Sequence, residues 1–399
     1  MFRAALLLFT LSVVPPALAE AVHVRNTTPA QPPRTVHLEE VWRIGGAESD
    51  ILFGTVTEAV VDPQGNVYLL DNQLNHVEVI SPAGEHVATL GREGDGPGEV
   101  RVARDVVFLE DGTIGIASLF PSQLVRLTPD GEPRPTLHMG GDGDPASGFY
   151  VTIGCEVRGG TLLFAGHRST PHELGQYRQL FLSRMTAAGK EAARFCETEM
   201  IVNFQTGEFV ERELIPAFFL THAIGPNGRI YAPRSRDLYV IDVYNPDGTL
   251  ERVIEREFDN RPRTPRERRR LEAIFGSAAR QIPREVSLVI EPANPVIAGL
   301  FVDANGNLWV KHSRSGDERP AGVLQTYDLF DPDGRYLQKV SIACEGDPLY
   351  DDLEFLTDGR VLLVKGHVLA FWSAFDFGTV DWDDEEDVSP PEVICYRMR

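Results

Sequence analysis

The chain has 399 residues, of which 42% are hydrophobic, so it is long enough to bury a large core. Its net charge of −21 argues against a nucleic-acid-binding protein, because neutralising phosphates requires a basic surface. The 36 Gly and 28 Pro indicate many turns, and four Cys are too few for a disulfide scaffold of this size.

The N-terminus has the pattern of a cleavable secretory signal. One cation, Arg3, precedes the apolar run from Ala4 to Val14, and the small-residue site Ala17-Leu18-Ala19 follows. The run is shorter than the roughly 20 residues that a membrane-spanning helix needs. We therefore predict a signal peptide over residues 1–19, an extended segment over 20–35, and a periplasmic or secreted protein without a membrane span.

From residue 36 onward, a pattern of two glycine turns repeats along the chain. Six times, an apolar run reaches a turn and continues as a second apolar run; the turns contain Gly65, Gly112, Gly160, Gly228, Gly306 and Gly359. A second turn follows each of the first five, at Gly84, Gly131, Gly189, Gly248 and Gly334. Such turns between β-rich runs predict hairpins. Two hairpins per repeat make a unit of four short strands, and six such units are typical of a β-propeller.

The two ends of the repeat region predict how the ring closes. After its hairpin the sixth unit has only one clear further strand, Val393 to Tyr396, and one unpartnered strand, Val36 to Ile44, precedes the first unit. Pairing these strands would remove two exposed sheet edges. We therefore predict an all-β protein with a single domain over 36–399. It is a six-bladed propeller of four-stranded antiparallel blades, closed by the N-terminal strand joining the last blade.

The first repeat resembles a known family. The stretch from Gly65 to Val79 contains the Asp71 and the Asn75-His76 pair of an NHL repeat, and the following Leu90 to Glu99 resembles the same family. The resemblance implies a six-bladed propeller of the NHL type, here of an exported bacterial kind. That family includes both binding modules and metal-dependent enzymes.

The long insertions all fall on one face of the predicted propeller. If the strands of a blade are lettered a to d from the channel outward, the a–b and c–d turns share one face and the other connections share the opposite face. The insertions cover 167–179, 197–216, 255–295, 312–321 and 371–391, all on the second face. Loops on one side of a rigid scaffold commonly carry binding. We expect a protein or small-molecule ligand there; the alternative is that the loops are solvated elaborations without a ligand.

The largest insertion contains a predicted helix near 264–280. Thr264 to Glu267 form a capping box with proline at the first helical position, and apolar residues follow at helical spacing from Leu271 to Ala278. The other face of this helix is basic and includes Arg266, Arg269 and Arg270. This pattern fits a cover that packs on the propeller, and it also fits an anion site or a partner helix.

An acidic run lies on the same predicted face, between residues 381 and 387. It includes Asp383, Asp384 and Glu385, which we assign with the basic helix to a partner face. Because opposite charges attract, we expect the run to dock on the helix; the weaker alternative is that it binds a cation.

Three carboxylates occupy equivalent positions on the innermost strands. Glu58, Asp105 and Asp352 each stand seven residues before the first glycine of their repeat, so they should ring the channel. Grouped carboxylates raise one another's pKa or recruit a cation, and oxygen ligands suit Ca²⁺ or another divalent cation. The alternative is that Arg104 and water satisfy them.

Two functions therefore remain open. The first is an exported, monomeric recognition or scaffold protein that binds a ligand or protein partner on the insertion-rich face. The second is a lactonase-like, metal-dependent hydrolase or lyase, in which a cation at the channel mouth polarises a carbonyl and His222 is the candidate base.

The cysteine pairing also stays open at this stage. Cys155 and Cys196 belong to the first and last strands of one predicted blade, too far apart for a disulfide. Cys344 and Cys395 belong to neighbouring blades and could meet only if one edge curled inward.

Overall fold

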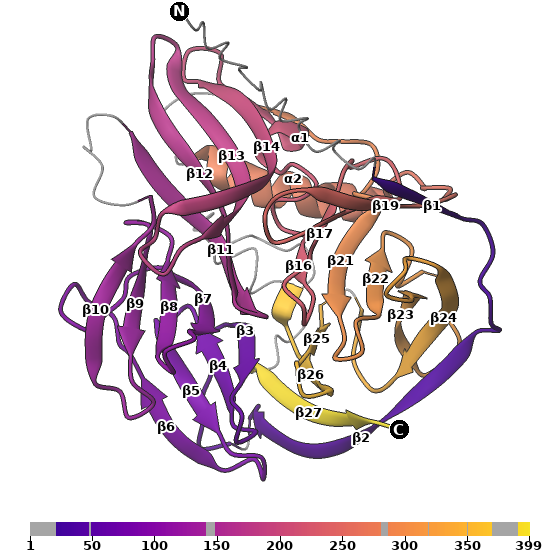
Figure 1. Cartoon of the computed structure of the whole chain (residues 1–399), viewed down its shortest axis with the longest axis horizontal. Coiled ribbons are helices and arrows are strands. Elements are labelled where there is room, and N and C mark those ends of the chain that lie inside the picture. The colour runs from indigo at the N-terminus through magenta and orange to yellow at the C-terminus, as the bar shows by residue number, and fades with distance from the viewer. Residues whose placement is uncertain are drawn as a thin grey trace, which may run out of the picture.

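The computed structural model describes residues 21–47, 49–140, 148–280, 286–317, 319–348, 350–368 and 390–399. These residues form an all-β, propeller-like arrangement of small antiparallel sheets, with a small helical share that includes α1 (Glu211–Leu214) and α2 (Pro265–Arg280) (Figure 1). The predicted signal peptide and the acidic residues Asp383, Asp384 and Glu385 lie outside the described residues. No helix in the described part of the chain is long and apolar enough to cross a bilayer.

Four sheets follow one another along the chain, each an antiparallel meander. The first contains β3 (Val56–Val61), β4 (Val67–Asp71), β5 (His76–Ile80) and β6 (His86–Leu90). The second contains β7 (Ala103–Phe108), β8 (Ile114–Ser118), β9 (Gln123–Leu127) and β10 (Pro133–His138). The third contains β11 (Phe149–Arg158), β12 (Thr161–His172), β13 (Gly175–Met185) and β14 (Glu191–Asn203). The fourth contains β16 (Ala223–Ile224), β17 (Ile230–Pro233), β18 (Val240–Tyr244) and β19 (Leu250–Arg256), with β1 (Val22–Asn26) parallel to β19.

A fifth, eight-stranded sheet contains the rest of the ring. One part is β21 (Ile297–Val302), β22 (Leu308–His312), β23 (Val323–Phe330) and β24 (Tyr336–Ala343); the other is β25 (Asp352–Phe355), β26 (Arg360–Val364), β27 (Glu392–Met398) and β2 (Arg34–Gly45). Strand β2 joins the two parts, because its start pairs with β24 and its remainder pairs antiparallel with β27. The predicted pairing of the N-terminal strand with the last strand is therefore confirmed. Strands β15 (Glu208–Val210) and β20 (Ser287–Val289) form a separate pair.

The turns have the backbone conformation that their glycines predict. All six first-turn glycines have positive φ; Gly65 lies at 85° and Gly228 at 77°. At Gly228 a Cβ atom would also come within 2.9 Å of the Thr161 hydroxyl of the preceding sheet. A larger residue there would strain the backbone and push the two sheets apart.

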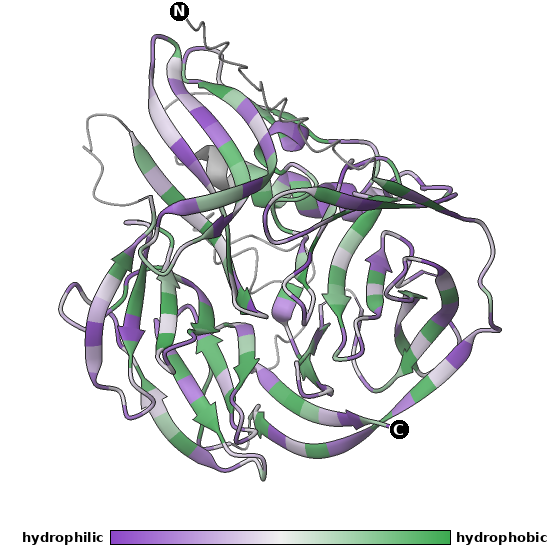
Figure 2. Ribbon diagram, viewed as in Figure 1, coloured by the Kyte–Doolittle hydropathy of each residue, from purple (hydrophilic) through white to green (hydrophobic). Residues whose placement is uncertain are grey.

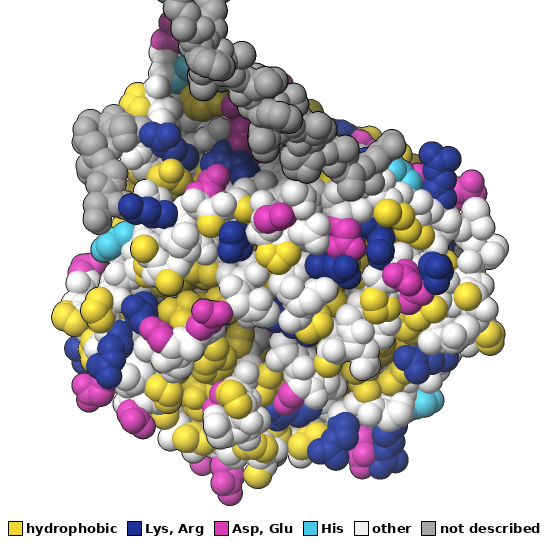
Figure 3. Space-filling model, in the orientation of Figure 1, with side chains coloured by type: hydrophobic (Ala, Val, Ile, Leu, Met, Phe, Trp, Pro, Cys, Tyr) yellow, Lys and Arg dark blue, Asp and Glu magenta, His cyan; other side chains and the backbone are white. Residues whose placement is uncertain are grey.

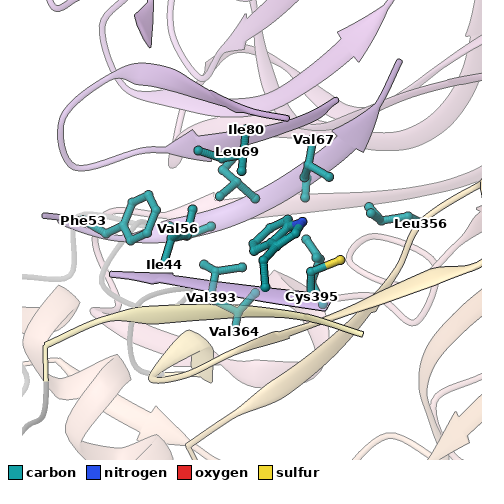
Figure 4. Packing of buried hydrophobic residues seen from close by; sticks show 13 residues of the cluster. Ile44, Phe53, Val56, Val67, Leu69, Ile80, Leu356, Val364, Val393 and Cys395 are labelled. Carbon is teal, nitrogen blue, oxygen red and sulfur yellow. The ribbon is translucent and has the colours of Figure 1, made fainter. Parts of the chain in front are cut away.

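The core lies between neighbouring sheets. The second strands, β4 and β8, are buried throughout, whereas the outermost strands, β6 and β10, are largely exposed, and β10 is mostly hydrophilic (Figure 2). Between the first sheet and the β2–β27 part of the last one, Trp42, Val67 and Cys395 belong to one buried cluster (Figure 4). All four cysteines are free thiols, so the structure contains no disulfide among them.

The third sheet differs from the prediction. The sequence predicted an inserted loop over 167–179, but β12 continues to His172 and β13 begins at Gly175. The insertion therefore lengthens a hairpin, which projects from the ring with β14 (Figure 1). The physical reason is that its backbone groups keep pairing along the ladder, as Thr170 does with Tyr177.

Candidate functional site

Two cavities meet at the centre of the ring. The inner cavity, of about 540 Å³, is lined by the innermost strands β3, β7, β11, β16, β21 and β25. The outer cavity, of about 640 Å³, lies between these strands and the insertions that carry α1 and α2. The two share Glu58, Lys311, Asp352 and Glu354 in their linings, so they adjoin. On the face shown in Figure 3, acidic and basic side chains are interspersed and form no single-sign patch.

The innermost strands bring five carboxyl groups to the inner cavity. Glu58, Asp105 and Asp352 line it, as the sequence predicted, and Glu156 and Glu354 line it too. The last two were missed. Glu354 could have been found from its position two residues after Asp352, because residues i and i+2 of a strand share a face. Arg104, which the sequence suggested as their partner, is buried but lines neither cavity.

Three of these carboxyl groups bond to the innermost strand of the next sheet, one of them being Glu156, which accepts from the Ile224 amide. Glu354 accepts a hydrogen bond from the Ala59 amide at 2.7 Å, and Asp105 accepts one from the Cys155 amide at 2.9 Å. These bonds brace neighbouring sheets and offset part of the cost of burying the carboxyl groups. In contrast, the Glu58 carboxyl group has no hydrogen bond or ion pair with any described residue.

Burial shifts the acidity of this group strongly. It raises the pKa of Asp105 to about 7 and the pKa values of Glu156 and Glu354 to about 8. Burial, reinforced by the charges of Asp105 and Glu354, also raises the pKa of Glu58 well above its ordinary range. Near neutral pH the cavity thus holds carboxylic acids that can donate as well as accept hydrogen bonds.

Asp352 behaves differently, because it has a cationic partner. Both of its carboxylate oxygens lie 2.7 Å from Lys311 Nζ, and Oδ1 also accepts a hydrogen bond from Gln325 at 2.8 Å. Although burial opposes the shift, Lys311 holds the pKa of Asp352 below its ordinary value. The side chain is therefore an ionised and already neutralised carboxylate.

The predicted metal ligands do not form a ready cation site in this arrangement. Within the described ranges, no three His, Cys, Asp or Glu side chains lie close enough together to hold a metal ion. The Lys311 ammonium already neutralises Asp352. A role for Glu58, Asp105 and Asp352 as ligands of Ca²⁺ or another divalent cation stays a prediction.

His222 lines the inner cavity, where the sequence placed a candidate base. Its Nδ1 lies 3.2 Å from the Phe218 carbonyl oxygen, which can only accept, so Nδ1 carries the proton and Nε2 holds the lone pair. Burial lowers the pKa of His222 to about 4, so the ring is neutral at pH 7. A Cβ atom on Gly154 would lie within 4 Å of both His222 and Asp105, so glycine keeps this part of the cavity open.

Helix α2 forms one wall of the outer cavity. Its capping box is confirmed, since the Glu267 amide donates to Thr264 Oγ1 at 3.2 Å and the Thr264 amide donates to Glu267 Oε2 at 2.6 Å. Ile274 and Phe275 are buried, as expected of a cover that packs on the propeller. The partner-face arginines separate. Arg270 lines the cavity, Arg266 donates to the Tyr350 hydroxyl at 3.0 Å, and Arg269 is exposed.

A buried ionic network lies next to the start of this helix. Glu211 of α1 binds Arg236, which follows β17, and Arg263, which precedes α2. The Glu291 amide also donates to Glu211 at 2.9 Å. Sequence reasoning missed this network, and no local pattern could have revealed it, because its members come from separate segments.

Comparisons with known proteins support the fold alone. No protein-family model matches the chain, and no curated protein matches it. A Bacteroides fragilis protein whose name describes it only as exported is 11% identical, covers 95% of this chain and 100% of its own, and superposes with a TM-score of 0.51. A gluconolactonase from Xanthomonas campestris is 13% identical over 87% of each chain, with a TM-score of 0.43. A streptogramin B lyase is 10% identical over 91% of this chain and 98% of its own, also at 0.43. The resemblance to NHL repeats stays a prediction.

Proposed function

We propose that this protein is an exported recognition protein that binds a small molecule in the outer cavity, on the insertion-rich face of the propeller. The observation that carries the proposal is the cavity of about 640 Å³ between α2 and the innermost strands. Its volume falls within the roughly 300–1,000 Å³ of small-molecule sites. We count the eight-stranded sheet as two blades, which makes the propeller six-bladed.

The composition of the lining supports this proposal. Leu271 and Ile274 of α2 and Leu220, which shortly precedes β16, give the cavity an apolar wall, and the ionisable groups described above converge on it. Ligand sites combine a mostly apolar surface with a few polar groups that orient the ligand. A purely structural insertion would instead fill this space with packed side chains.

The test is to block the cavity without touching its charges. Ala298 of β21 is exposed to both cavities, so Ala298→Phe should occupy their junction. A panel of carboxylic acids, sugars, amines and lactones is screened by thermal shift. A true ligand at about 100 times its Kd adds roughly 2.7 kcal/mol of stability to the native protein, and the variant should lose this effect. Ala188→Phe, in an exposed turn, is the matched control. Stabilisation that persists in Ala298→Phe would place the ligand elsewhere, and no stabilisation of the native protein would refute the proposal.

A second candidate function, a lactonase-like hydrolase or lyase, is favoured by one observation in the inner cavity. Neutral His222 and the protonated carboxyl groups beside it could act as general base and general acid. His222→Gln should then slow turnover of a lactone panel by about 10²–10⁴-fold. His138→Gln, on the exposed β10, should leave the rate unchanged. Absence of lactone turnover by the native protein would rule this candidate out.

A further inference from the structure

The two cavities share Glu58 of β3 in their linings. The residue is only partly exposed, and its carboxyl group has no hydrogen bond or ion pair with any described residue. Its oxygens are not among the fully buried polar atoms that lack a partner, so they are accessible to solvent. The carboxyl group can therefore bind a molecule that occupies the cavities.

Every other carboxyl group in the two linings already has a partner in the described part of the chain. Four are held by arginine or lysine side chains: Glu211, Glu267, Asp317 and Asp352. Three accept hydrogen bonds from backbone amides: Asp105, Glu156 and Glu354. Glu58 is thus the carboxyl group that a ligand can engage without displacing an existing partner.

Carboxyl groups outnumber cationic side chains in both linings. Five carboxyl groups line the inner cavity together with the cations Arg158 and Lys311, and six line the outer cavity together with Lys311 and four arginines. The histidines of the two linings are neutral at pH 7, because burial lowers the pKa of each of them. Burial, and then the charges of neighbouring carboxyl groups, raise the pKa of Glu58. A cation beside Glu58 would be attracted by the same groups and would favour their ionised forms.

A primary ammonium group fits this place. It has three N–H donors and one positive charge, and it needs no fixed set of metal ligands. The fold already holds one such group nearby, because Lys311 Nζ lies 2.7 Å from both oxygens of Asp352, and these two residues also line both cavities. Leu220 lines both cavities as well, so an apolar surface begins where the acidic groups end.

We propose that the junction of the two cavities binds the primary ammonium group of a small molecule with an apolar body. The ammonium group lies against Glu58, and the apolar body packs in the outer cavity on Leu220, Leu271 and Ile274. The inference rests on the proposed function, because the outer cavity must first bind a small molecule. It adds the chemical class of that molecule.

The experiment compares head groups on one apolar chain. Octylammonium, octyltrimethylammonium, octanol and octanoate are titrated into the purified protein by calorimetry. We expect octylammonium to bind about tenfold or more tightly than octanol, and octanoate to bind most weakly. Octyltrimethylammonium carries the charge without an N–H donor, so it should bind more weakly than octylammonium.

Three outcomes would overturn the inference. Equal binding of octylammonium and octanol removes the preference for a cation and leaves small-molecule binding intact. Binding of octyltrimethylammonium as tight as that of octylammonium excludes the hydrogen bond to Glu58. No binding by any of the four probes also overturns the inference, while the thermal-shift panel decides the proposed function independently.

Two variants of Glu58 locate the ammonium group. Glu58→Gln keeps the shape of the side chain and removes its charge, so it should weaken octylammonium binding about tenfold and leave octanol unchanged. Glu58→Asp keeps the charge and should bind octylammonium more tightly than Glu58→Gln does. Neither substitution breaks a side-chain hydrogen bond to a described residue, and thermal melts check that both variants fold.

The matched control is Glu85→Gln, which removes a carboxyl group from an exposed turn and should bind all four probes like the native protein. Native octylammonium affinity in Glu58→Gln, or equal affinity in Glu58→Gln and Glu58→Asp, overturns the assignment to Glu58.

Discussion

At the residue scale, the innermost strands carry carboxyl groups that a buried position would ordinarily exclude. Glu354 and Asp105 remain there because each accepts a hydrogen bond from a backbone amide of the next sheet. Lys311 neutralises Asp352, whereas Glu58 has neither kind of partner among the described residues. Glu58, Asp105 and Asp352 occupy equivalent strand positions, yet Asp105 bonds to the next sheet, Asp352 forms an ion pair, and the Glu58 carboxyl group does neither. The difference depends on which groups lie beside each carboxyl group.

The raised pKa values of these carboxyl groups predict how stability depends on pH. Burial raises the pKa of Glu354 from 4.5 to about 8, so between these values the folded protein holds a proton that the unfolded chain releases. Stability from this group is therefore greatest below about pH 4.5 and is lost as the pH rises through 8. Glutamine imitates the neutral acid and can still accept from the Ala59 amide. Glu354→Gln should raise the melting temperature by about 1–4 °C at pH 9 and leave it nearly unchanged at pH 5.

Thermal melts at pH 5, 7 and 9 check this expectation. Glu85→Gln, at an exposed turn, should show no difference at any pH. A shift of the same size at pH 5 and pH 9 would mean that a change in packing, and not ionisation, causes the effect.

At the element scale, α2 is a wall of the outer cavity whose position depends on its N-terminus. The reciprocal bonds of Thr264 and Glu267 begin the helix, and Arg261 holds Glu267 from outside it at 2.9 Å. Arg261, with backbone and hydroxyl hydrogen bonds from Thr264, lowers the pKa of Glu267 to about 2 against the opposing effect of burial. Glu267 is thus ionised across the physiological range, and the capping contact persists over that range.

Loss of the cap should weaken both the helix and the cavity. Thr264→Ala removes the acceptor for the Glu267 amide and should cost about 1 kcal/mol of unfolding free energy. Ligand affinity in the outer cavity should fall with it, because Leu271 and Ile274 would no longer be held in place. Urea denaturation measures the first effect. Thr206→Ala, at an exposed loop position, should be nearly neutral. A cost below about 0.3 kcal/mol would show that packing alone positions α2.

At the scale of the whole molecule, the N-terminal segment connects sheets that are distant in sequence. Strand β1 pairs with β19, and β2 then pairs with β24 and with β27 (Figure 1). At the end of β1, the side-chain amide of Asn26 donates hydrogen bonds to the backbone carbonyls of Glu255 and Gly334 at 3.2 and 3.0 Å. Its side-chain oxygen accepts a hydrogen bond from the Tyr336 backbone amide at 2.8 Å. One side chain thereby joins the fourth sheet to the fifth.

Removing this connection should lower the stability of the ring as a unit. Asn26→Ala loses these three hydrogen bonds and a longer one to the Val24 carbonyl at 3.4 Å, and should reduce the unfolding free energy by about 1–3 kcal/mol in urea denaturation. His23 lies on β1 with Asn26, and its side chain forms a partly exposed pair with Glu255 of β19. His23→Ala removes only this pair and should cost less than about 1 kcal/mol. Equal effects of the two substitutions would contradict a role for Asn26 in joining the sheets.

The amino-acid sequence by itself determined the strands, the hairpins, the start of α2 and the closing pair β2–β27. Each of these depends on local information: glycine at a turn that needs positive φ, alternating side chains along a strand, or a cap three residues from its partner. It also identified Glu58, Asp105 and Asp352 as inner-cavity residues, because equivalent strand positions face the same centre, and His222 as the neighbour of such a position.

Only the tertiary structure decided what those residues do to one another. The pairing of Lys311 with Asp352, the network of Glu211, Arg236 and Arg263, and the length of the β12–β13 hairpin all depend on which segments become neighbours. The pKa and the charge of each group depend on how deeply it is buried and on its nearest partner in a neighbouring sheet. Burial and partner choice both depend on contacts between segments that are far apart in the sequence. The chain therefore specified a ring of strands directly, while the character of its central cavities depended on how the sheets and insertions packed around them.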